Sequence, residues 1–181
     1  MRHVRLAFLA VLALASASAP LHAQRARTSS ASRPNVWELG LDAALSFGLD
    51  TPKSTRFSIP VSNVRAGIFT TDVIEIEPFL SLQYIKPEGS GAVTAYNFGT
   101  GLLYHFSPDR AKSQVYVRPF LDIAGFSGGG TSDSNVGAGV GVGMKWPRMN
   151  GRFAWRGEFN VASMNDNTSL NLLWGLSYFT R

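Results

Sequence analysis

The sequence contains no cysteine among its 181 residues, so no disulfide can stabilise the fold. It also lacks the run of roughly 20 apolar residues that a helix needs to cross a bilayer. The longest apolar stretch, Leu6 to about Ala17, has only about a dozen residues. Histidine occurs three times and shows no metal-ligand spacing with Asp or Glu. We therefore expect neither a disulfide scaffold, nor a helical membrane protein, nor a metal site.

Residues 1–23 have the layout of a secretory signal peptide. A basic start is followed by the apolar stretch and by small residues that end at Ala23. We expect cleavage after Ala23, because a cut after Ala19 would place the restrained Pro20 directly behind the cleaved bond. The alternative, a short core helix, is disfavoured by the charged start and the Ala/Ser-rich end.

Removal of this segment takes away Arg2 and Arg5 and no acid, so the net charge falls from +5 to +3. That charge is too small to indicate a nucleic-acid partner. Residues 24–34 are polar and aperiodic, which predicts a disordered lead-in on the periplasmic side. Residues 35–181 remain as one domain.

Apolar and polar residues alternate along most of this domain, which is typical of strands with one apolar and one polar face. Trp37, Leu39, Leu41 and their odd-numbered successors to Leu49 oppose Glu38 and the following even positions. The runs are longer than the usual 5 to 6 residues of a soluble strand, whereas a membrane strand needs about 9 to 11. We predict strands over 36–49, 58–69, 73–85, 94–106, 115–126, 135–146, 152–161 and 168–179.

Two features disturb these strands. In 58–69, Ile59 and Val61 have the opposite parity to Val64, so a bulge near Ser62 or a later strand start is needed. Pro60, Pro78 and Pro119 fall inside strands, where a missing N–H breaks the hydrogen-bond ladder. Pro78 and Pro119 lie in similar segments, which predicts matching bulges and a possible duplicated hairpin.

The connections fall into two sets, which predicts an all-β, eight-stranded antiparallel up-and-down transmembrane β-barrel with both ends of the chain on one side. The first set, 50–57, 86–92, 127–134 and 163–167, would lie outside the cell. The second set, 70–72, 107–114 and 147–151, would form the turns on the periplasmic side.

The charged residues of the strands fall on the polar faces, and none lies in the middle of an apolar face. We predict an interior charge network of Glu38, Asp42, Arg65, Glu75, Glu77, Arg118, Asp122, Lys145, Arg152, Arg156 and Glu158. Glycines such as Gly139 and Gly141 would leave room for these side chains in an interior that is barely wide enough to be filled. Six acids nearly balance five bases, which favours a plugged lumen with little conductance.

A soluble lipocalin-like barrel would show the same alternation with the apolar face inside. Aromatic placement favours the membrane, because the rings gather at the two ends of the strands, as at membrane interfaces. The expected interface aromatics are Trp37, Phe47, Tyr84, Tyr96, Tyr104, Phe106, Trp146, Phe153, Trp155, Phe159 and Tyr178. Phe69, Tyr116 and Phe179 are expected at the same belt as Trp37.

In strand count, aromatic belts and the aromatic-rich final strand Leu170–Phe179, residues 35–181 resemble the small eight-stranded outer-membrane barrels, the OmpA transmembrane domain and OmpX type. The sequence departs from them where Thr180 and Arg181 follow the last aromatic. No peptidoglycan-binding domain follows, so an anchoring role is not expected. The resemblance implies a monomer in the bacterial outer membrane, inserted by the barrel-assembly machinery, with lipid and lipopolysaccharide as the expected partners.

Candidate sites are few, and we expect no catalytic, cofactor-binding or metal site. His105-Phe106-Ser107 is similar to the His-x-Ser of outer-membrane lipid A deacylases, but Ser107 precedes Pro108 and no acid is placed by the sequence, so a hydrogen-bonded rim histidine is favoured. Gly128-Gly129-Gly130 lacks the Lys of a phosphate loop. Lys53, Arg56 and Lys86 would lie near lipopolysaccharide phosphates or in solvent.

Three functions remain open at this point. The leading hypothesis is a structural or membrane-integrity barrel. The second is a surface protein that binds partners through its outer loops, although these loops carry few aromatic anchors. The third is a lipid-modifying enzyme.

Overall fold

In a computed structural model of the chain, the described residues are 36–50, 54–58, 63–85, 93–128, 131–148 and 151–180. The predicted signal peptide and lead-in, residues 1–34, lie outside them. No helix among the described residues is long and apolar enough to cross a membrane. The strands are β1 (Trp37–Gly48), β2 (Ser54–Ser58), β3 (Asn63–Phe69), β4 (Ile74–Ile85), β5 (Val93–His105), β6 (Gln114–Gly128), β7 (Thr131–Arg148), β8 (Phe153–Met164) and β9 (Asn167–Phe179).

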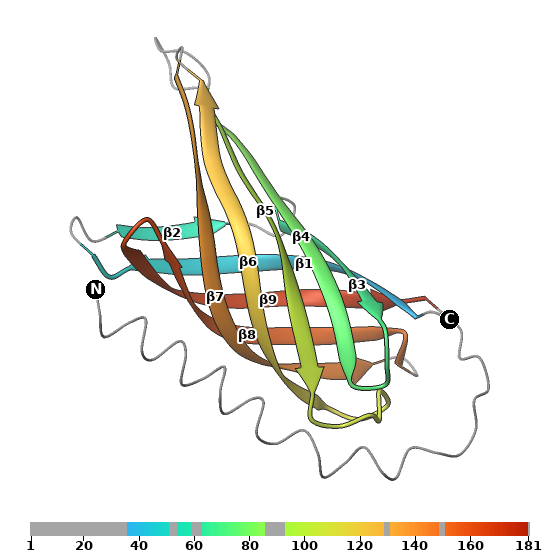
Figure 1. Ribbon diagram of the computed structural model, residues 1–181. Helices are drawn as coiled ribbons and strands as arrows, with labels where there is room; N and C mark the ends of the chain where they lie inside the picture. Colours follow the sequence, from blue (N-terminus) through green and yellow to red (C-terminus); the bar gives the residue numbers. More distant parts are fainter. Residues whose placement is uncertain are drawn as a thin grey trace. The chain divides into compact units, whose positions relative to one another are not determined.

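The strands form one antiparallel sheet that closes on itself, because β1 pairs with β9 from Glu38↔Phe179 to Gly48↔Ser169 (Figure 1). β2 and β3 both pair with the same side of β1, β2 along its second half and β3 along its first half. Together they make one barrel strand. The described wall therefore has eight strands, and the predicted fold class is confirmed.

The break in this second strand changes its register. Ala44 pairs with Ser58 and Leu41 pairs with Val64, so a step of three residues along β1 corresponds to a step of six residues along the other strand. Because the three extra residues are an odd number, the strand presents opposite faces on the two sides of the break. This explains why the parity of Ile59 and Val61 differs from that of Val64, and it places the predicted interruption between Ser58 and Asn63.

The predicted bulges at Pro78 and Pro119 are wrong, whereas Pro60 lies outside the described residues. The register of β3 with β4 is the same on both sides of Pro78, and that of β5 with β6 is the same on both sides of Pro119. Only the pairs at each proline and at the residue before it are missing, on the side of β3 for Pro78 and on the side of β5 for Pro119. The ladder loses hydrogen bonds locally without an inserted residue.

Three predicted loops are shorter than expected. Residues 127–134 are largely strand, because β6 and β7 remain paired up to Gly128↔Thr131. β8 and β9 are joined by Asn165 and Asp166 alone, with φ of 48° and 61°, the positive values of a type I′ turn. In the predicted loop 50–57, residues Ser54 onward belong to β2.

Four strands project beyond the rest of the wall. β8 pairs with β7 only as far as Gly137↔Met164, and β3 pairs with β4 only as far as Asn63↔Ser81. Among the described residues, Thr131–Val136 therefore pair only with β6, and Leu82–Ile85 only with β5. We call the outer ends of β4, β5, β6 and β7 the projecting sheet (Figure 1).

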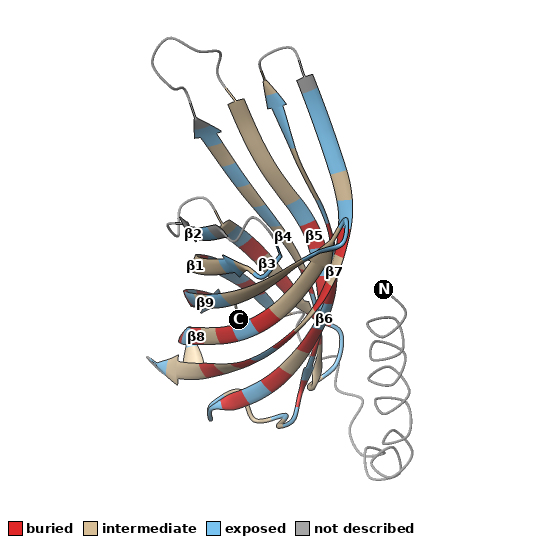
Figure 2. Ribbon diagram, turned by 90° about the vertical axis from the view of Figure 1, so that its left-hand side faces the viewer, coloured by how far each residue is buried: buried red, intermediate tan, exposed pale blue. Residues whose placement is uncertain are grey.

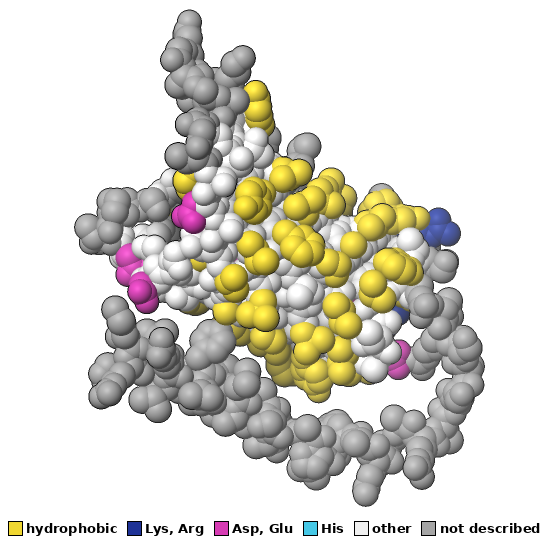
Figure 3. All heavy atoms as spheres, turned by 45° about the horizontal axis from the view of Figure 1, so that its top comes forward, with side chains coloured by type: hydrophobic (Ala, Val, Ile, Leu, Met, Phe, Trp, Pro, Cys, Tyr) yellow, Lys and Arg dark blue, Asp and Glu magenta, His cyan; other side chains and the backbone are white. Residues whose placement is uncertain are grey.

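The two faces of the wall differ sharply. Along β6, the side chains of Gln114, Tyr116 and Arg118 are buried, whereas those of Val115 and Leu121 are exposed. Buried and exposed residues alternate in the same way along the other strands (Figure 2). Large apolar side chains cover the outer face, among them Leu121 at 60% and Val142 at 57% exposure (Figure 3). Charges are buried inside and apolar groups lie outside, so the lipocalin-like alternative is wrong. The outer face is suited to lipid.

Candidate functional site: the charged interior

Ten of the eleven predicted interior charges are buried in the barrel: Glu38, Asp42, Arg65, Glu75, Glu77, Arg118, Asp122, Lys145, Arg156 and Glu158. The eleventh, Arg152, is exposed, because β8 begins only at Phe153 and Arg152 belongs to the turn before it. The interior therefore holds six acids and four bases, a larger acidic excess than the sequence suggested. One of these acids, Asp122, lies in the outer half of the lumen.

Arg65 of β3 joins three strands across the lumen. Its Nε donates to Asp42 Oδ2 at 2.8 Å and its Nη2 to Ser177 Oγ at 2.7 Å, while Nη1 contacts Glu38 and lies 3.2 Å from Glu77 Oε2. Because the guanidinium presents its donors in a fixed plane, one side chain links β1, β4 and β9 at once.

A second group is centred on Glu158 of β8. Arg118 Nη2 lies 2.5 Å from Glu158 Oε1, and Arg156 Nη2 lies 2.5 Å from Glu158 Oε2. Tyr116 Oη donates to the same Oε2 at 2.8 Å and accepts from Arg156 Nε at 2.6 Å. Arg156 also contacts Glu77, which connects this group to Arg65.

The third group lies toward the end of the barrel that carries the chain termini. Lys145 Nζ contacts Glu38 and lies 2.7 Å from Glu75 Oε2, and His105 Nε2 lies 2.8 Å from the same oxygen. His105 is hydrogen-bonded, as expected, and is the last residue of β5, but its side chain is wholly buried and points into the interior instead of lying exposed at the rim. The polar parity of His105 within β5 was the available signal for this position. We call these three groups together, Asp122 excepted, the interior charge cluster.

Glycines of β7 make the space for this cluster. An added Cβ at Gly139 would meet the Phe120 ring, one at Gly141 would lie 2.6 Å from Glu158 Oε1, and one at Gly143 would meet Tyr116. Side chains of β6 and β8 therefore lie against the backbone of β7 at these glycines. The cluster fills the lumen at this level, as expected of an eight-stranded barrel.

Glu38, Glu75 and Glu77 offer carboxylate oxygens within 4.8 Å of one another, a spacing that a metal ion could bridge. Lys145, Arg65 and Arg156 already supply positive charge to these three carboxylates. The group therefore fits an ion-pair network of the chain's own side chains.

Eight of the predicted interface aromatics are exposed on the outer face: Trp37, Phe47, Tyr84, Tyr104, Phe106, Trp155, Phe159 and Tyr178. The other three, Tyr96, Trp146 and Phe153, are half-buried. Phe69, Tyr116 and Phe179 are buried, because they have the polar-face parity of their strands and point into the lumen. Their placement with the belt was wrong.

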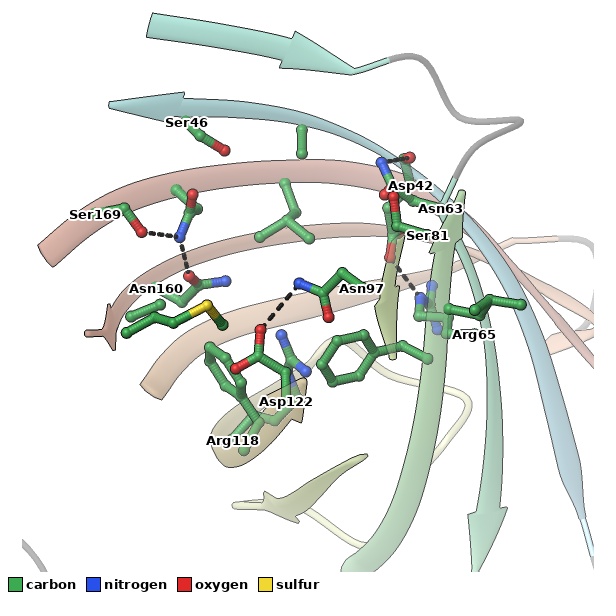
Figure 4. Close-up of a pocket in the computed structure, with 18 of the residues that line it drawn as sticks. Asp42, Ser46, Asn63, Arg65, Ser81, Asn97, Arg118, Asp122, Asn160 and Ser169 are labelled. Carbon is green, nitrogen blue, oxygen red and sulfur yellow. Dashed lines mark hydrogen bonds and ion pairs between the residues drawn. The ribbon is translucent and has the colours of Figure 1, made fainter. Parts of the chain in front are cut away.

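The lumen widens beyond the cluster into a cavity of about 450 Å³ in the half of the barrel nearest the loops (Figure 4). Neutral polar side chains predominate in its lining, among them Ser46, Asn63, Asn97, Asn160, Ser169 and Asn171. Asn171 Nδ2 donates to Asn160 Oδ1 at 2.8 Å, and Asn160 Nδ2 donates to Glu158 Oε1 at 3.0 Å, so an amide chain leads from the cavity to the cluster.

The remaining candidates show no assembled site. His105 contacts Glu75, whereas Ser107 Oγ accepts a hydrogen bond from the Asp109 N–H at 3.3 Å. Of the glycine run only Gly128 is described, as the end of β6. Lys53 and Lys86 lie outside the described residues, and Arg56 is described only as part of β2.

No protein-family model matches the sequence, and no relative is found among curated proteins. Solved structures do match. Neisserial surface protein A superposes with a TM-score of 0.58 at 17% identity, over 78% of this chain and 96% of that one. Ail, the attachment invasion locus protein of Yersinia pestis, gives 0.52 at 12% identity over 81% and 99%. The N-terminal β-barrel domain of Pseudomonas aeruginosa OprF gives 0.52 at 15% identity over 79% and 97%.

Proposed function

Because the chain has the fold of the small eight-stranded outer-membrane β-barrels, we propose that it is a non-enzymatic structural protein that helps to maintain the outer membrane. The observation that carries this proposal is the closed lumen. The interior charge cluster links strands on all sides of the barrel through buried ion pairs, such as Arg65 with Asp42 and Arg118 with Glu158. A lumen closed by paired charges in this way is suited to a structural role rather than to transport.

Two measurements test this proposal. The mature protein in planar bilayers should show no steady conductance, since the buried side chains of the cluster fill the lumen at their level. A deletion strain should become more sensitive to detergents and large antibiotics, and the wild-type chain should restore resistance. Stable channels together with an unchanged envelope would contradict the proposal.

The projecting sheet supports a second candidate, a surface protein that binds partners. Thr131–Val136 of β7 pair on one side only among the described residues, and such an edge can accept an extended peptide as an added strand. Exposed Ser132 and Asp133 make this edge polar, which suits a reversible contact.

The test compares cells that express the wild-type chain with cells whose β6–β7 hairpin is shortened at the Phe126↔Asp133 pair. A control carries Asn-Gly in place of Asn165-Asp166, which keeps a type I′ turn and the sheet. Binding to host-cell or matrix surfaces that only the shortened hairpin loses would favour this candidate. Equal binding by all three would leave the structural role.

A lipid A deacylase-like activity has little support from the interior. His105 is buried beside Glu75 and Lys145, away from the lipid-covered face, and Ser107 has a turn partner of its own. Mass spectra of lipid A from the deletion strain should match those of the parent. Barrel-assembly machinery and lipopolysaccharide remain proposed partners of a monomeric barrel.

A further inference from the structure

Asp122 is the interior carboxylate that the charge cluster leaves out. Glu38, Asp42, Glu75, Glu77 and Glu158 each have an ion-pair partner, whereas Asp122 has none among the described residues. Asp122 lines the cavity and is only 7% exposed. Among the described interior charges, six acids against four bases leave an excess of two negative charges, and Asp122 carries one of them without an ion-pair partner.

The neighbours of Asp122 leave hydrogen-bond acceptors unfilled. Asn97 Nδ2 donates to Asp122 Oδ2 at 2.9 Å between the paired strands β5 and β6, on one wall of the cavity (Figure 4). Asp122 Oδ1 and Asn97 Oδ1 are both buried and have no partner among the described residues. Burying such acceptors without a donor is unfavourable, the more so for a carboxylate. The pair is therefore prepared for a group that brings donors and positive charge.

We propose that the cavity binds a small organic cation whose primary ammonium group donates to Asp122 Oδ1 and Asn97 Oδ1. An ammonium has three donors and one positive charge, which fit these two acceptors and the acidic excess. A divalent metal ion fits less well, because Mg²⁺ and Ca²⁺ take six or more oxygen ligands. Phe79 and Phe120 also line the cavity; the Arg118 guanidinium already lies over both rings, so their remaining surface would contact the ligand's carbon chain.

The size and the far wall of the cavity fit such a molecule. A volume of about 450 Å³ lies within the roughly 300 to 1,000 Å³ of small-molecule sites. The opposite lining of Ser169, Asn171 and Asn160 offers neutral donors and acceptors for a second polar end. The cavity ends at the charge cluster, so the ligand would be held and not passed through, and the site is compatible with a closed barrel.

The side chain of Met164 lies beside the free oxygen of Asp122. A Cβ added at Gly137 would lie 2.5 Å from Asp122 Oδ1 and 2.7 Å from the Met164 methyl, so the oxygen and the methyl group lie against the same bare stretch of β7. Met164 is the last residue of β8, next to the two-residue turn, and its side chain is unbranched and flexible. Binding would displace this methyl group.

The test measures binding of 1,4-diaminobutane to the mature protein in lipid nanodiscs by NMR titration, with 1,4-butanediol as the neutral probe of the same length. Asp122→Asn keeps the shape and removes the charge, and we expect it to weaken diamine binding at least about tenfold. The matched control, Asp133→Asn, changes an exposed acid of the projecting sheet and should bind as the wild type does.

Met164→Ala should strengthen diamine binding a few fold, because it removes a side chain that lies beside Asp122 Oδ1 and that the ligand would have to displace. This variant and the comparison of diamine with diol decide the matter even if Asp122→Asn does not fold. Absence of diamine binding, equal binding of diamine and diol, or full affinity in Asp122→Asn would overturn the proposal. None of these results would bear on the conductance or envelope measurements above.

Discussion

Arg118 of β6 reaches over β7 to Glu158 of β8, with Arg118 Nε 3.0 Å from Glu158 Oε2 and Nη2 2.5 Å from Oε1. The strand between them carries Gly141, where a Cβ would lie 2.6 Å from Glu158 Oε1. The pair exists because the intervening strand has no side chain at that level. The ion pair between β6 and β8 therefore depends on the glycine of the strand between them.

Removal of Arg118 should destabilise the barrel strongly. Arg118→Ala leaves Glu158 and Glu77 with less compensating charge in a buried site, which is expected to cost about 3 to 5 kcal/mol. The measurement is the free energy of unfolding in urea for protein folded into lipid vesicles. Lys112→Ala serves as the control, since Lys112 is 80% exposed in a turn. Equal losses for the two variants would contradict a coupled interior.

Gly141→Val should also destabilise the barrel, by about 1 to 3 kcal/mol, because the added methyl groups would overlap the Glu158 carboxylate and force it to move. Ala138→Val is the matched control on the outer face of the same strand, three residues away. It should change the free energy of unfolding little. If both valines were tolerated, the glycines of β7 would not be needed for the side chains that cross them.

Much of the fold follows from the period-two alternation. In a barrel that exposes apolar residues to lipid, nearly every strand must keep its apolar residues on the outer face and its polar residues on the inner face. The alternation in residues 135–146 correctly predicts which side chains of β7 face the interior. The change of parity at Ile59 correctly predicts a break in the second strand of the barrel. Strand ends were less predictable. Ser132 and Asp133 point to opposite faces of β7 and both are polar. The part of β7 that extends beyond the wall therefore shows no alternation of apolar and polar residues by which a strand could be predicted.

The candidate site was predictable as a face but not as a set of contacts. Parity alone places Glu38 and Arg65 inside, yet their contact depends on the stagger of β1 against β3. Arg152 was misassigned because a charge at a strand end has the same parity whether it lies in the strand or in the turn. Asp122 could not be distinguished from the other acids, since its lack of an ion-pair partner is a property of the three-dimensional arrangement.

The mature chain should fractionate with the outer membrane and resist extraction by salt or carbonate. The physical reason is the outer face, where side chains such as Leu121 and Phe98 are more than half exposed and would otherwise contact water. Immunoblots of separated inner and outer membranes would check this, with a soluble periplasmic protein as the marker for incomplete separation. Recovery of the folded chain with that marker would rule out membrane integration.

Val142→Arg tests the depth and the orientation of the wall together. The part of β7 that is paired on both sides runs from Gly137 to Lys145, so its centre lies at Gly141, and the outward residues next to that centre are Val140 and Val142. Val142 is 57% exposed, and an arginine there, or at Val140, should cost about 2 to 4 kcal/mol if it faces the bilayer near its midplane.

The control for that substitution is Ser134→Arg, which lies on the same strand in the projecting sheet, where the exposed side chain is beyond the wall paired with β8. Its free energy of unfolding should stay close to that of the wild type. Cysteine probes at 140 and 139 add an independent readout, because Val140 faces outward and Gly139 is buried under Phe120. A lipid-soluble quencher should reach the probe at 140 and not the one at 139. If the accessible probe were at 139, the inward and outward faces of β7 would have to be exchanged, and the charge cluster could not lie inside the barrel.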